Sequence, residues 1–249
     1  MHGSILRENV WLFGGIGYDS AGTNAYLNDL WKYSNGEWTW MGGSNLADQN
    51  GAYGTLGTSS AANVPGARGS GWLWTDPSGN VWLFGGSGFD SAGTLGELND
   101  LWKYSNGQWT WMDGSNLANQ VGTYGTEGVP SGPDTPGGRD NTVGWVDSSG
   151  NLWLFGGEVY DFSTGMADQL NDLWKYSNDE WTWMSGSDLA DQLGTYGTMG
   201  TPKPSNIPGA RGTPMTWIDA QGNLWFFGGT GYDSAGTVGD LSDVWKYEP

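Results

Sequence analysis

The side chains best suited to bind a cation are aspartates that recur in four loops of related sequence. The loops read GYDSAGT or a close variant of it. Carboxylate, hydroxyl and carbonyl oxygens lie close together in such loops, and Ca²⁺ prefers these hard ligands. The regular DxDxDG spacing of a calcium loop is absent. The loops therefore leave two interpretations open, Asx-turns or a calcium site, and calcium is the only cofactor to consider. The aspartates are Asp19, Asp90, Asp161 and Asp233.

Three arginines form a second recurring group. Arg68, Arg139 and Arg211 each stand at the end of a long polar loop of similar sequence. A ring of guanidinium groups could line a channel and bind a ligand. Alternatively, each arginine ties its own loop to the body of the protein through hydrogen bonds or an acidic partner. Both interpretations stay open from the sequence.

Aromatic side chains form the third recurring group, and the chain has 18 tryptophans. Flat aromatic rings can stack on the apolar faces of sugars, although burial in a core is the more common role of a tryptophan in a strand. We expect Trp74, Trp145 and Trp217 to line a central opening. We expect an exposed aromatic rim at four loop positions, which are Tyr18, Phe89, Tyr160 and Tyr232.

No set of residues typical of an enzyme stands out. The chain has no cysteine, and its only histidine is His2, to which we assign no role. These two residue types supply many general bases, nucleophiles and metal ligands. Almost every polar residue is copied from repeat to repeat, whereas an enzyme generally needs one asymmetric site. We therefore predict no catalytic residues and a protein that is not an enzyme.

A repeat built around the apolar phrase WLFGG, or WFFGG, positions these residues. Its first tryptophan lies at positions 11, 82, 153 and 225, so the period is 71, 71 and 72 residues. We expect a single domain of residues 1–249 with repeats at approximately 5–64, 65–135, 136–207 and 208–249, the first and last incomplete. An apolar run that ends in a glycine pair predicts a buried strand running into a sharp bend.

Each full repeat contains four predicted strands. One ends in Trp-x-Asp, and the others are the phrase itself, LNDLWKYS and WTWM. The Asn35–Gly36 pair between two aromatic-rich runs predicts a hairpin. Residues 4–9 could add a short extra strand. Four consecutive antiparallel strands per repeat are typical of a propeller blade, so we expect an all-β fold.

These positions resemble the kelch repeat over nearly the whole chain. The resemblance implies a kelch-type β-propeller, distantly similar to the central domain of galactose oxidase, with long loops like those of bacterial secreted or surface kelch-like proteins. The copper site of that oxidase uses a Tyr–Cys cross-link and histidines, which this chain cannot supply. The matching residues are Gly14-Gly15, Gly85-Gly86, Gly156-Gly157 and Gly228-Gly229, then Tyr33, Tyr104, Tyr176 and Tyr247, then Trp38, Trp109 and Trp181.

The number of strands leaves the closure of the propeller open. The first and last repeats each lack one of the four strands, so that 14 strands are recognisable in the sequence. Three arrangements fit this pattern: a four-bladed ring with a thin closing blade, a larger ring assembled from two chains, or part of a longer array. Unpaired strand edges favour association, so a homo-oligomer formed through the incomplete repeats is expected in the second case.

The charge of the chain excludes some classes of partner. It has 27 acidic and 9 basic residues, and the formal net charge is -18. Nucleic-acid phosphates and anionic membrane surfaces would repel such a protein. No apolar stretch approaches the ~20 residues of a membrane span, and the N-terminus shows no signal peptide.

We therefore expect a non-catalytic module that binds protein or glycan through its repeated loops. The resemblance implies a secreted, cell-surface or periplasmic location. One alternative is a structural, self-assembling repeat protein that is recently duplicated or consensus-designed. A sugar-active propeller enzyme is the other alternative, and it would require an asymmetric cluster of carboxylates in a central opening.

Overall fold

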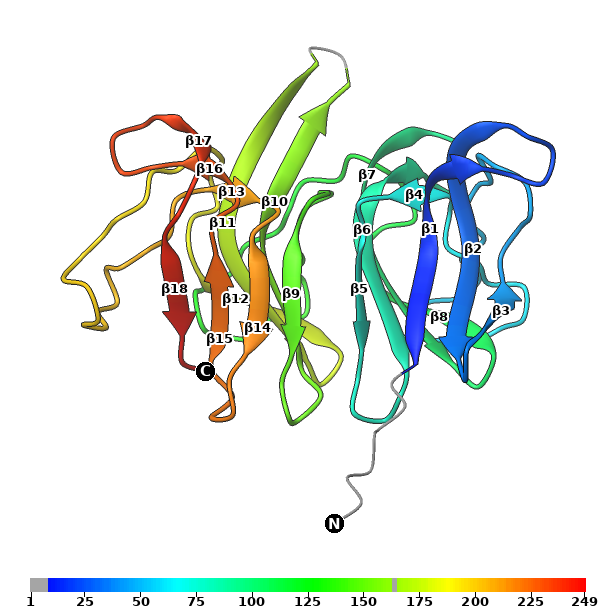
Figure 1. Cartoon of the computed structure of the whole chain (residues 1–249), viewed down its shortest axis with the longest axis horizontal. Helices are drawn as coiled ribbons and strands as arrows, with labels where there is room; N and C mark the ends of the chain where they lie inside the picture. Colours follow the sequence, from blue (N-terminus) through cyan, green and yellow to red (C-terminus); the bar gives the residue numbers. More distant parts are fainter. Residues whose placement is uncertain (1–8, 163–164) are drawn as a thin grey trace.

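All regular elements among the described residues are β-strands (Figure 1). The computed structural model describes residues 9–162 and 165–249. The predicted all-β class is thus confirmed, while the extra strand expected at residues 4–9 falls almost wholly outside the described residues. None of the described residues forms a helix that is long and apolar enough to cross a membrane.

The strands form four consecutive units, which we number 1 to 4. Unit 1 consists of β1 (Val10–Tyr18), β2 (Asn24–Ser34) and β3 (Glu37–Gly42). Unit 2 consists of β4 (Arg68–Gly69), β5 (Trp72–Thr75), β6 (Val81–Phe89), β7 (Leu95–Ser105) and β8 (Gln108–Asp113). Unit 3 consists of β9 (Val143–Val146), β10 (Leu152–Asp161), β11 (Met166–Ser177) and β12 (Glu180–Ser185). Unit 4 consists of β13 (Arg211–Gly212), β14 (Met215–Ile218), β15 (Leu224–Phe227), β16 (Thr230–Tyr232), β17 (Val238–Asp240) and β18 (Val244–Tyr247).

Within a unit, neighbouring strands are antiparallel. Unit 3 has the strand order β12-β11-β10-β9, and units 1 and 2 follow the same pattern where their strands correspond. In unit 4 the pairing is divided between two small sheets, β14-β15-β18 and β13-β16-β17. The hairpins expected at Asn-Gly pairs are present. Asn106 and Gly107, with φ of 52° and 81°, connect β7 to β8, since a two-residue hairpin turn favours left-handed residues.

The glycine pair bends the strand that contains the WLFGG sequence, at the point where the next unit approaches. In β6, Gly85 and Gly86 have φ of 61° and 96°, and the register with β7 shifts between Phe84 and Gly86. A Cβ on Gly85 would lie 2.7 Å from the carbonyl oxygen of Arg139. The Gly86 N–H donates to that same oxygen at 2.9 Å. Glycine is therefore required here both for its positive φ and for close contact between units.

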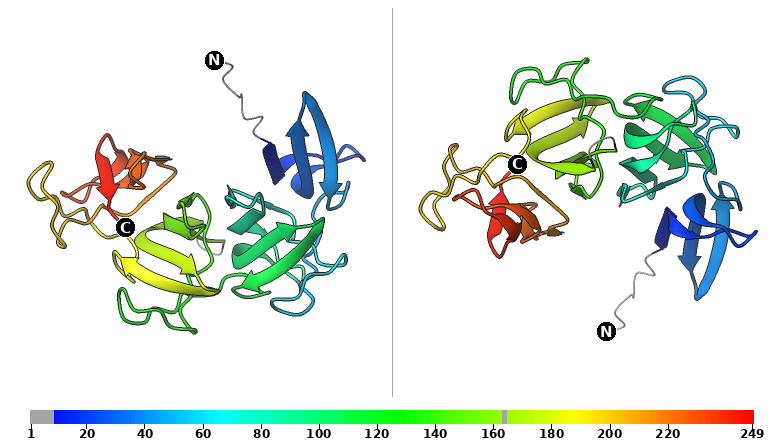
Figure 2. Two further views of the ribbon diagram at one scale, coloured as in Figure 1. Left: turned by 90° about the horizontal axis from the view of Figure 1, so that it is seen from below. Right: turned by 90° about the horizontal axis from the view of Figure 1, so that it is seen from above.

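The hydrophobic core lies between consecutive units. One cluster joins unit 1 to unit 2, a second joins unit 2 to unit 3, and a third joins unit 3 to unit 4. Figure 2 shows the units following one another along an arc, with units 1 and 4 at its two ends. The described residues therefore form an open arc in this view rather than a closed ring of four units.

The repeated lysine and tryptophan of each unit are cross-strand neighbours. Lys103 pairs with Trp82 in the register of β6 and β7, and its Nζ lies 5.0 Å from the tryptophan ring centroid. The same cation–π contact occurs in the three other units. The copied lysines thus cover the tryptophan rings of their own sheets.

Candidate functional site

The three repeated arginines are buried inside the fold. In unit 3, Arg139 Nη1 and Nη2 lie 2.6 and 2.8 Å from the two carboxylate oxygens of Asp172, and the pair is fully buried. Its Nη1 also donates to the carbonyl oxygen of Gly156. Arg68 and Arg211 make the same contacts in units 2 and 4. The structure thus shows the tying role for these arginines, whose guanidinium groups are buried against aspartates.

A tyrosine from each long loop completes this buried network. Tyr124 donates its hydroxyl hydrogen to Asp172 at 2.7 Å, and the indole N–H of Trp174 donates to the same oxygen at 2.7 Å. The environment of Tyr124 raises the pKa of its hydroxyl, through burial first and the Asp172 charge second. Because Tyr124 comes from the loop that follows unit 2, the network joins that loop to unit 3. Tyr53 and Tyr196 donate to the corresponding aspartates.

The aspartates considered as calcium ligands accept hydrogen bonds within their own turns. One carboxylate oxygen of Asp90 accepts from the N–H groups of Ala92 and Thr94, and the other accepts from the N–H of Ala118. Asp19 makes the equivalent bonds, and Asp233 makes the two turn bonds. These backbone donors lower the pKa of Asp19 and Asp233. The side chain of Asp161 lies outside the described residues.

The Asx-turn interpretation accounts for the aspartates that the structure describes. Within residues 9–162 and 165–249, no group of three acidic, histidine or cysteine side chains is arranged to hold a metal ion. Calcium binding by these loops stays a prediction.

The tryptophans expected around a central opening divide between core and surface. Trp74 and Trp145 are buried in the clusters between units. The indole N–H of Trp145 donates to carbonyl oxygens of Trp217 and Trp225 in unit 4. Trp217 itself is largely exposed. Two of the three expected residues thus contribute to packing between units and are not available to a ligand.

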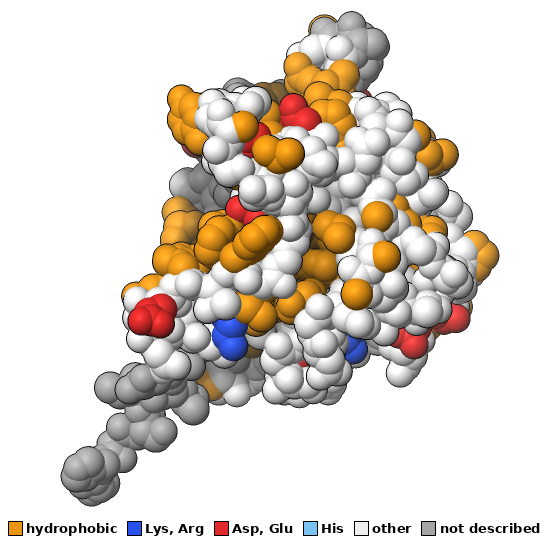
Figure 3. Space-filling model, turned by 90° about the vertical axis from the view of Figure 1, so that its right-hand side faces the viewer, with side chains coloured by type: hydrophobic (Ala, Val, Ile, Leu, Met, Phe, Trp, Pro, Cys, Tyr) orange, Lys and Arg blue, Asp and Glu red, His pale blue; other side chains and the backbone are white. Residues whose placement is uncertain are grey.

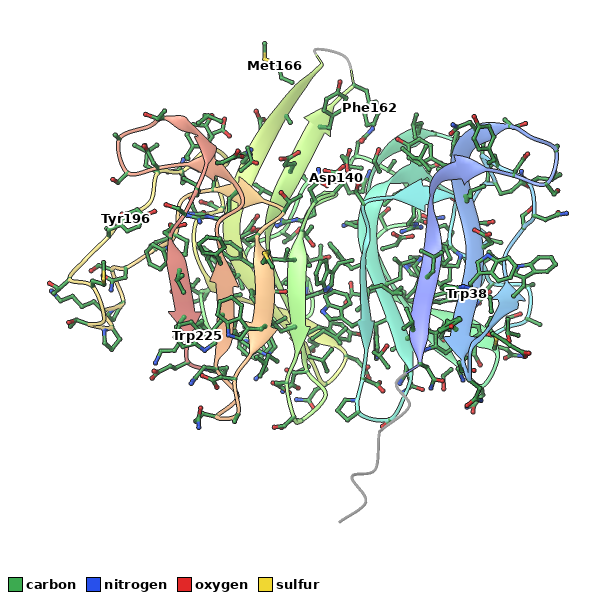
Figure 4. All side chains as sticks on the ribbon, in the orientation of Figure 1. Trp38, Asp140, Phe162, Met166, Tyr196 and Trp225 are labelled. Atoms are coloured by element: carbon green, nitrogen blue, oxygen red, sulfur yellow. The ribbon has the colours of Figure 1, made fainter. Side chains whose placement is uncertain are left out.

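The expected aromatic rim is most developed in unit 3. Tyr18 and Tyr160 are exposed, whereas Phe89 and Tyr232 are half-buried. Only Tyr160, among these four, has an exposed aromatic neighbour in its own loop. Its ring and that of Phe162 meet edge to face, with centroids 4.9 Å apart. Phe162 lies at the tip of β10, above the junction of units 2 and 3 (Figure 4).

A cavity of about 700 Å³ opens beside this aromatic pair. Tyr160, Phe162 and Val159 line it from unit 3, and the loop between units 2 and 3 contributes the opposite wall. Polar side chains on that wall are Asn119 and Gln120, and Asp188 adds a carboxylate from the next loop. We call this hollow the third-unit cavity.

Val159, which lines the cavity, stands where units 2 and 4 have glycine. The equivalent residues are Gly88 in unit 2 and Gly231 in unit 4, where the long loop lies directly against the strand. A Cβ at these glycines would lie 2.4 Å from the Ala67 oxygen and 2.1 Å from the Ala210 oxygen. Val159 carries a side chain at this position in unit 3, where the loop still pairs with the strand at the preceding residue through Asp140 and Glu158.

Three carboxylic acids lie next to the cavity, between units 2 and 3. Glu97 is buried, and neither of its carboxylate oxygens has a hydrogen-bond partner. Burial raises its pKa to about 8, and the charges of Asp140 and Glu158 contribute. Burial and the Glu158 charge raise the pKa of Asp140 to about 6. Asn141 donates to Glu158 at 3.1 Å. Figure 4 shows Asp140 at this junction.

Recurring residues could not reveal this acidic cluster, because its members do not recur from unit to unit. Glu97 of unit 2 and Glu158 of unit 3 both belong to one cross-strand pair position of the repeat, and the residues at this position differ in all four units. The residue after the repeated arginine is Asp140 in unit 3 but glycine in units 2 and 4. Departures from the repeat were the available signal. The pairs are Ile16–Tyr26, Ser87–Glu97, Glu158–Gln169 and Thr230–Asp240.

Comparison with known proteins gives remote structural neighbours, of which two are described here. No protein-family model matches the chain, and neither does any curated protein sequence. The solved structure of YjhT has a TM-score of 0.41 and 14% identity, covering 96% of this chain and 81% of that chain. A copper-bound fungal alcohol oxidase of the AA5 family has a TM-score of 0.30 and 13% identity, covering 95% and 63%. Both scores lie below 0.5, and the all-β architecture described above rests on the sheets themselves.

Proposed function

We propose that this protein is a non-catalytic recognition module that binds a glycan in the third-unit cavity. The observation that carries the proposal is the exposed Tyr160–Phe162 pair beside a cavity of about 700 Å³. This volume lies within the range of small-ligand sites, which are mostly apolar with a few directed polar groups. A protein is the alternative ligand, because the repeated loops could also bind a protein surface.

The lining of the cavity has the chemistry that a sugar requires. Aromatic rings offer apolar faces for C–H groups, and the side chains of Asn119 and Gln120 can donate to and accept from hydroxyls. The net charge of -18 favours neutral sugars over uronic or sialic acids, because like charges repel at long range. A neutral oligosaccharide is therefore the ligand class we propose.

Binding is favoured over catalysis by the position of the acidic cluster. An acid with a raised pKa beside other carboxylates is typical of a proton donor in glycoside hydrolysis. A catalytic acid must come within hydrogen-bond distance of its substrate, however, and both Glu97 oxygens are buried. A sugar-active enzyme remains the second candidate. Detectable hydrolysis of the same oligosaccharides, lost in Glu97→Gln, would favour it.

A secreted or cell-surface location is part of the proposal. It is supported by the kelch resemblance, in which long loops accompany secreted and surface proteins. Export with a fused reporter, in a host able to secrete it, would test the location separately from ligand binding.

The binding test compares neutral cello-, chito-, xylo- and malto-oligosaccharides by tryptophan fluorescence and calorimetry. We expect one series to bind, and Phe162→Ala to weaken that binding at least about fivefold, because truncation of an aromatic anchor that carries binding energy costs more than about 1 kcal/mol. Val159→Gly should also weaken it by removing a side chain that lines the cavity. Tyr18→Ala, an exposed tyrosine of unit 1, is the matched control and should bind normally. Binding that is unchanged in both unit 3 variants would contradict the site.

A further inference from the structure

The same interface between units occurs three times within the chain. In each case the strand that contains the WLFGG sequence of one unit packs its tryptophan and phenylalanine against the following unit. Trp82 meets Tyr176 with ring centroids 5.9 Å apart, and Phe84 meets Trp181 at 5.5 Å. The contact between units 1 and 2 repeats both pairs, as Trp11–Tyr104 at 5.9 Å and Phe13–Trp109 at 5.6 Å. Trp153–Tyr247 at 5.5 Å repeats the first of them between units 3 and 4.

Unit 1 leaves one half of this interface uncovered. Val10, Leu12 and Trp38 are 54%, 50% and 51% exposed. They correspond to residues of units 2 and 3 that pack on the preceding unit and are at most 3% exposed. Figure 3, which views the side of the molecule where unit 1 lies, shows hydrophobic side chains gathered there. The buried equivalents are Val81, Leu83, Trp109, Leu152, Leu154 and Trp181.

Unit 4 leaves the opposite half uncovered. Trp217, Phe227 and Val244 are 43%, 40% and 54% exposed. They correspond to residues of units 2 and 3 that pack on the following unit and are at most 6% exposed. The buried equivalents are Trp74, Phe84, Leu101, Trp145, Phe155 and Leu173.

We propose that the unit 4 face of one copy binds the unit 1 face of a second copy, head to tail. The two faces are the complementary halves of an interface that the chain already forms internally, so a second copy supplies the residue types that each face packs against elsewhere. Large exposed apolar faces are typical of interaction sites. Because the two faces differ, the contact is heterologous and extends into a closed ring or an open assembly, according to the rotation between copies.

The contacts at the internal interfaces predict which residues meet at the interface between two copies. By equivalence with Trp82–Tyr176, Trp225 of one copy packs on Tyr33 of the other. By equivalence with Phe84–Trp181, Phe227 packs edge to face on Trp38. Trp225 and Trp38 lie at opposite ends of the arc (Figure 4). This inference does not depend on the proposed glycan site, which lies between units 2 and 3.

The test measures the mass of the 249-residue chain by light scattering after size exclusion, from low micromolar to near-millimolar concentration. We expect the mass to rise from 26.7 kDa to at least twice that value. Leu12→Asp and Phe227→Asp should each remain monomeric. Met199→Asp is the matched control, because Met199 is a fully exposed apolar residue outside both faces, and it should assemble like the parent.

Mixing the two face variants distinguishes a head-to-tail contact from a symmetric one. Leu12→Asp keeps its unit 4 face and Phe227→Asp keeps its unit 1 face, so the mixture should form a 1:1 pair although neither variant associates alone. Circular dichroism of each variant should match the parent, which separates lost assembly from lost folding. A parent that stays monomeric would overturn the proposal, as would association that persists in either variant alone or a mixture that forms no pair.

Discussion

Replacing Glu97 by glutamine should remove most of the dependence of stability on pH between pH 6.5 and 8.5. Glu97 is buried between units 2 and 3, its oxygens have no hydrogen-bond partner, and Asp140 and Glu158 face it. Burial first, and then the charges of Asp140 and Glu158, outweigh the lowering effect of the Ser87 side chain and raise the pKa of Glu97 to about 8. Glutamine keeps the shape of the protonated side chain but cannot ionise.

The magnitude follows from linkage between protonation and folding. A carboxyl group with a pKa of 4.5 in the unfolded chain and about 8 in the folded protein binds its proton more tightly when folded. Its stabilising effect is therefore complete below its unfolded pKa and is lost as the pH rises through 8. At 1.36 kcal/mol per unit, the parent should lose about 2 kcal/mol of unfolding free energy over this window. Asp140 and Asp113, with pKa values raised to about 6, titrate mostly below it.

Urea titrations followed by tryptophan fluorescence at several pH values would measure this loss. The stability of Glu97→Gln relative to the parent should increase by about 2 kcal/mol across the window. Glu180→Gln is the control, because Glu180 is exposed and glutamine stands at the equivalent position in unit 2, Gln108. That variant should keep the slope of the parent. Parallel pH profiles for the parent and Glu97→Gln would refute the argument that Glu97 is buried as the neutral acid.

Three further predictions test the packing of the units. Arg139→Met should cost about 3–5 kcal/mol in urea titrations, because it leaves the buried Asp172 charge unpaired, and Arg211→Met should cost less because its partner is partly exposed; equal losses would contradict this. Trp153→Ala should cost about 3–5 kcal/mol as a large-to-small core change, and a loss below about 1 kcal/mol would show that the ring is not buried. Gly85→Ala should lower the melting temperature more than Gly107→Ala, because both have positive φ but only Gly85 would clash with a neighbouring backbone.

The strands could be predicted from the sequence because their signals are local and repeated. Glycine pairs, Asn-Gly turns and alternating tryptophans each act within a few residues, and their repetition removes ambiguity. The partners of buried charges were harder to identify. Asp100 is paired with Arg68 although 32 residues separate them in the sequence. By contrast, the carboxylate of Asp76 accepts from the N–H groups of Ser78 and Asn80, which are only two and four residues away in the sequence.

The candidate site could not be predicted from recurring residues, because residues needed for folding recur in every unit whereas residues of a single site do not. A residue needed by every unit is copied, and the copied polar residues, including the arginines, serve folding. A single site requires residues that one unit has and the others lack. Val159 is one such residue, since it lines the cavity at a position where units 2 and 4 have glycine. In a chain of near-identical repeats, the positions that depart from the repeat are therefore where function should be sought first.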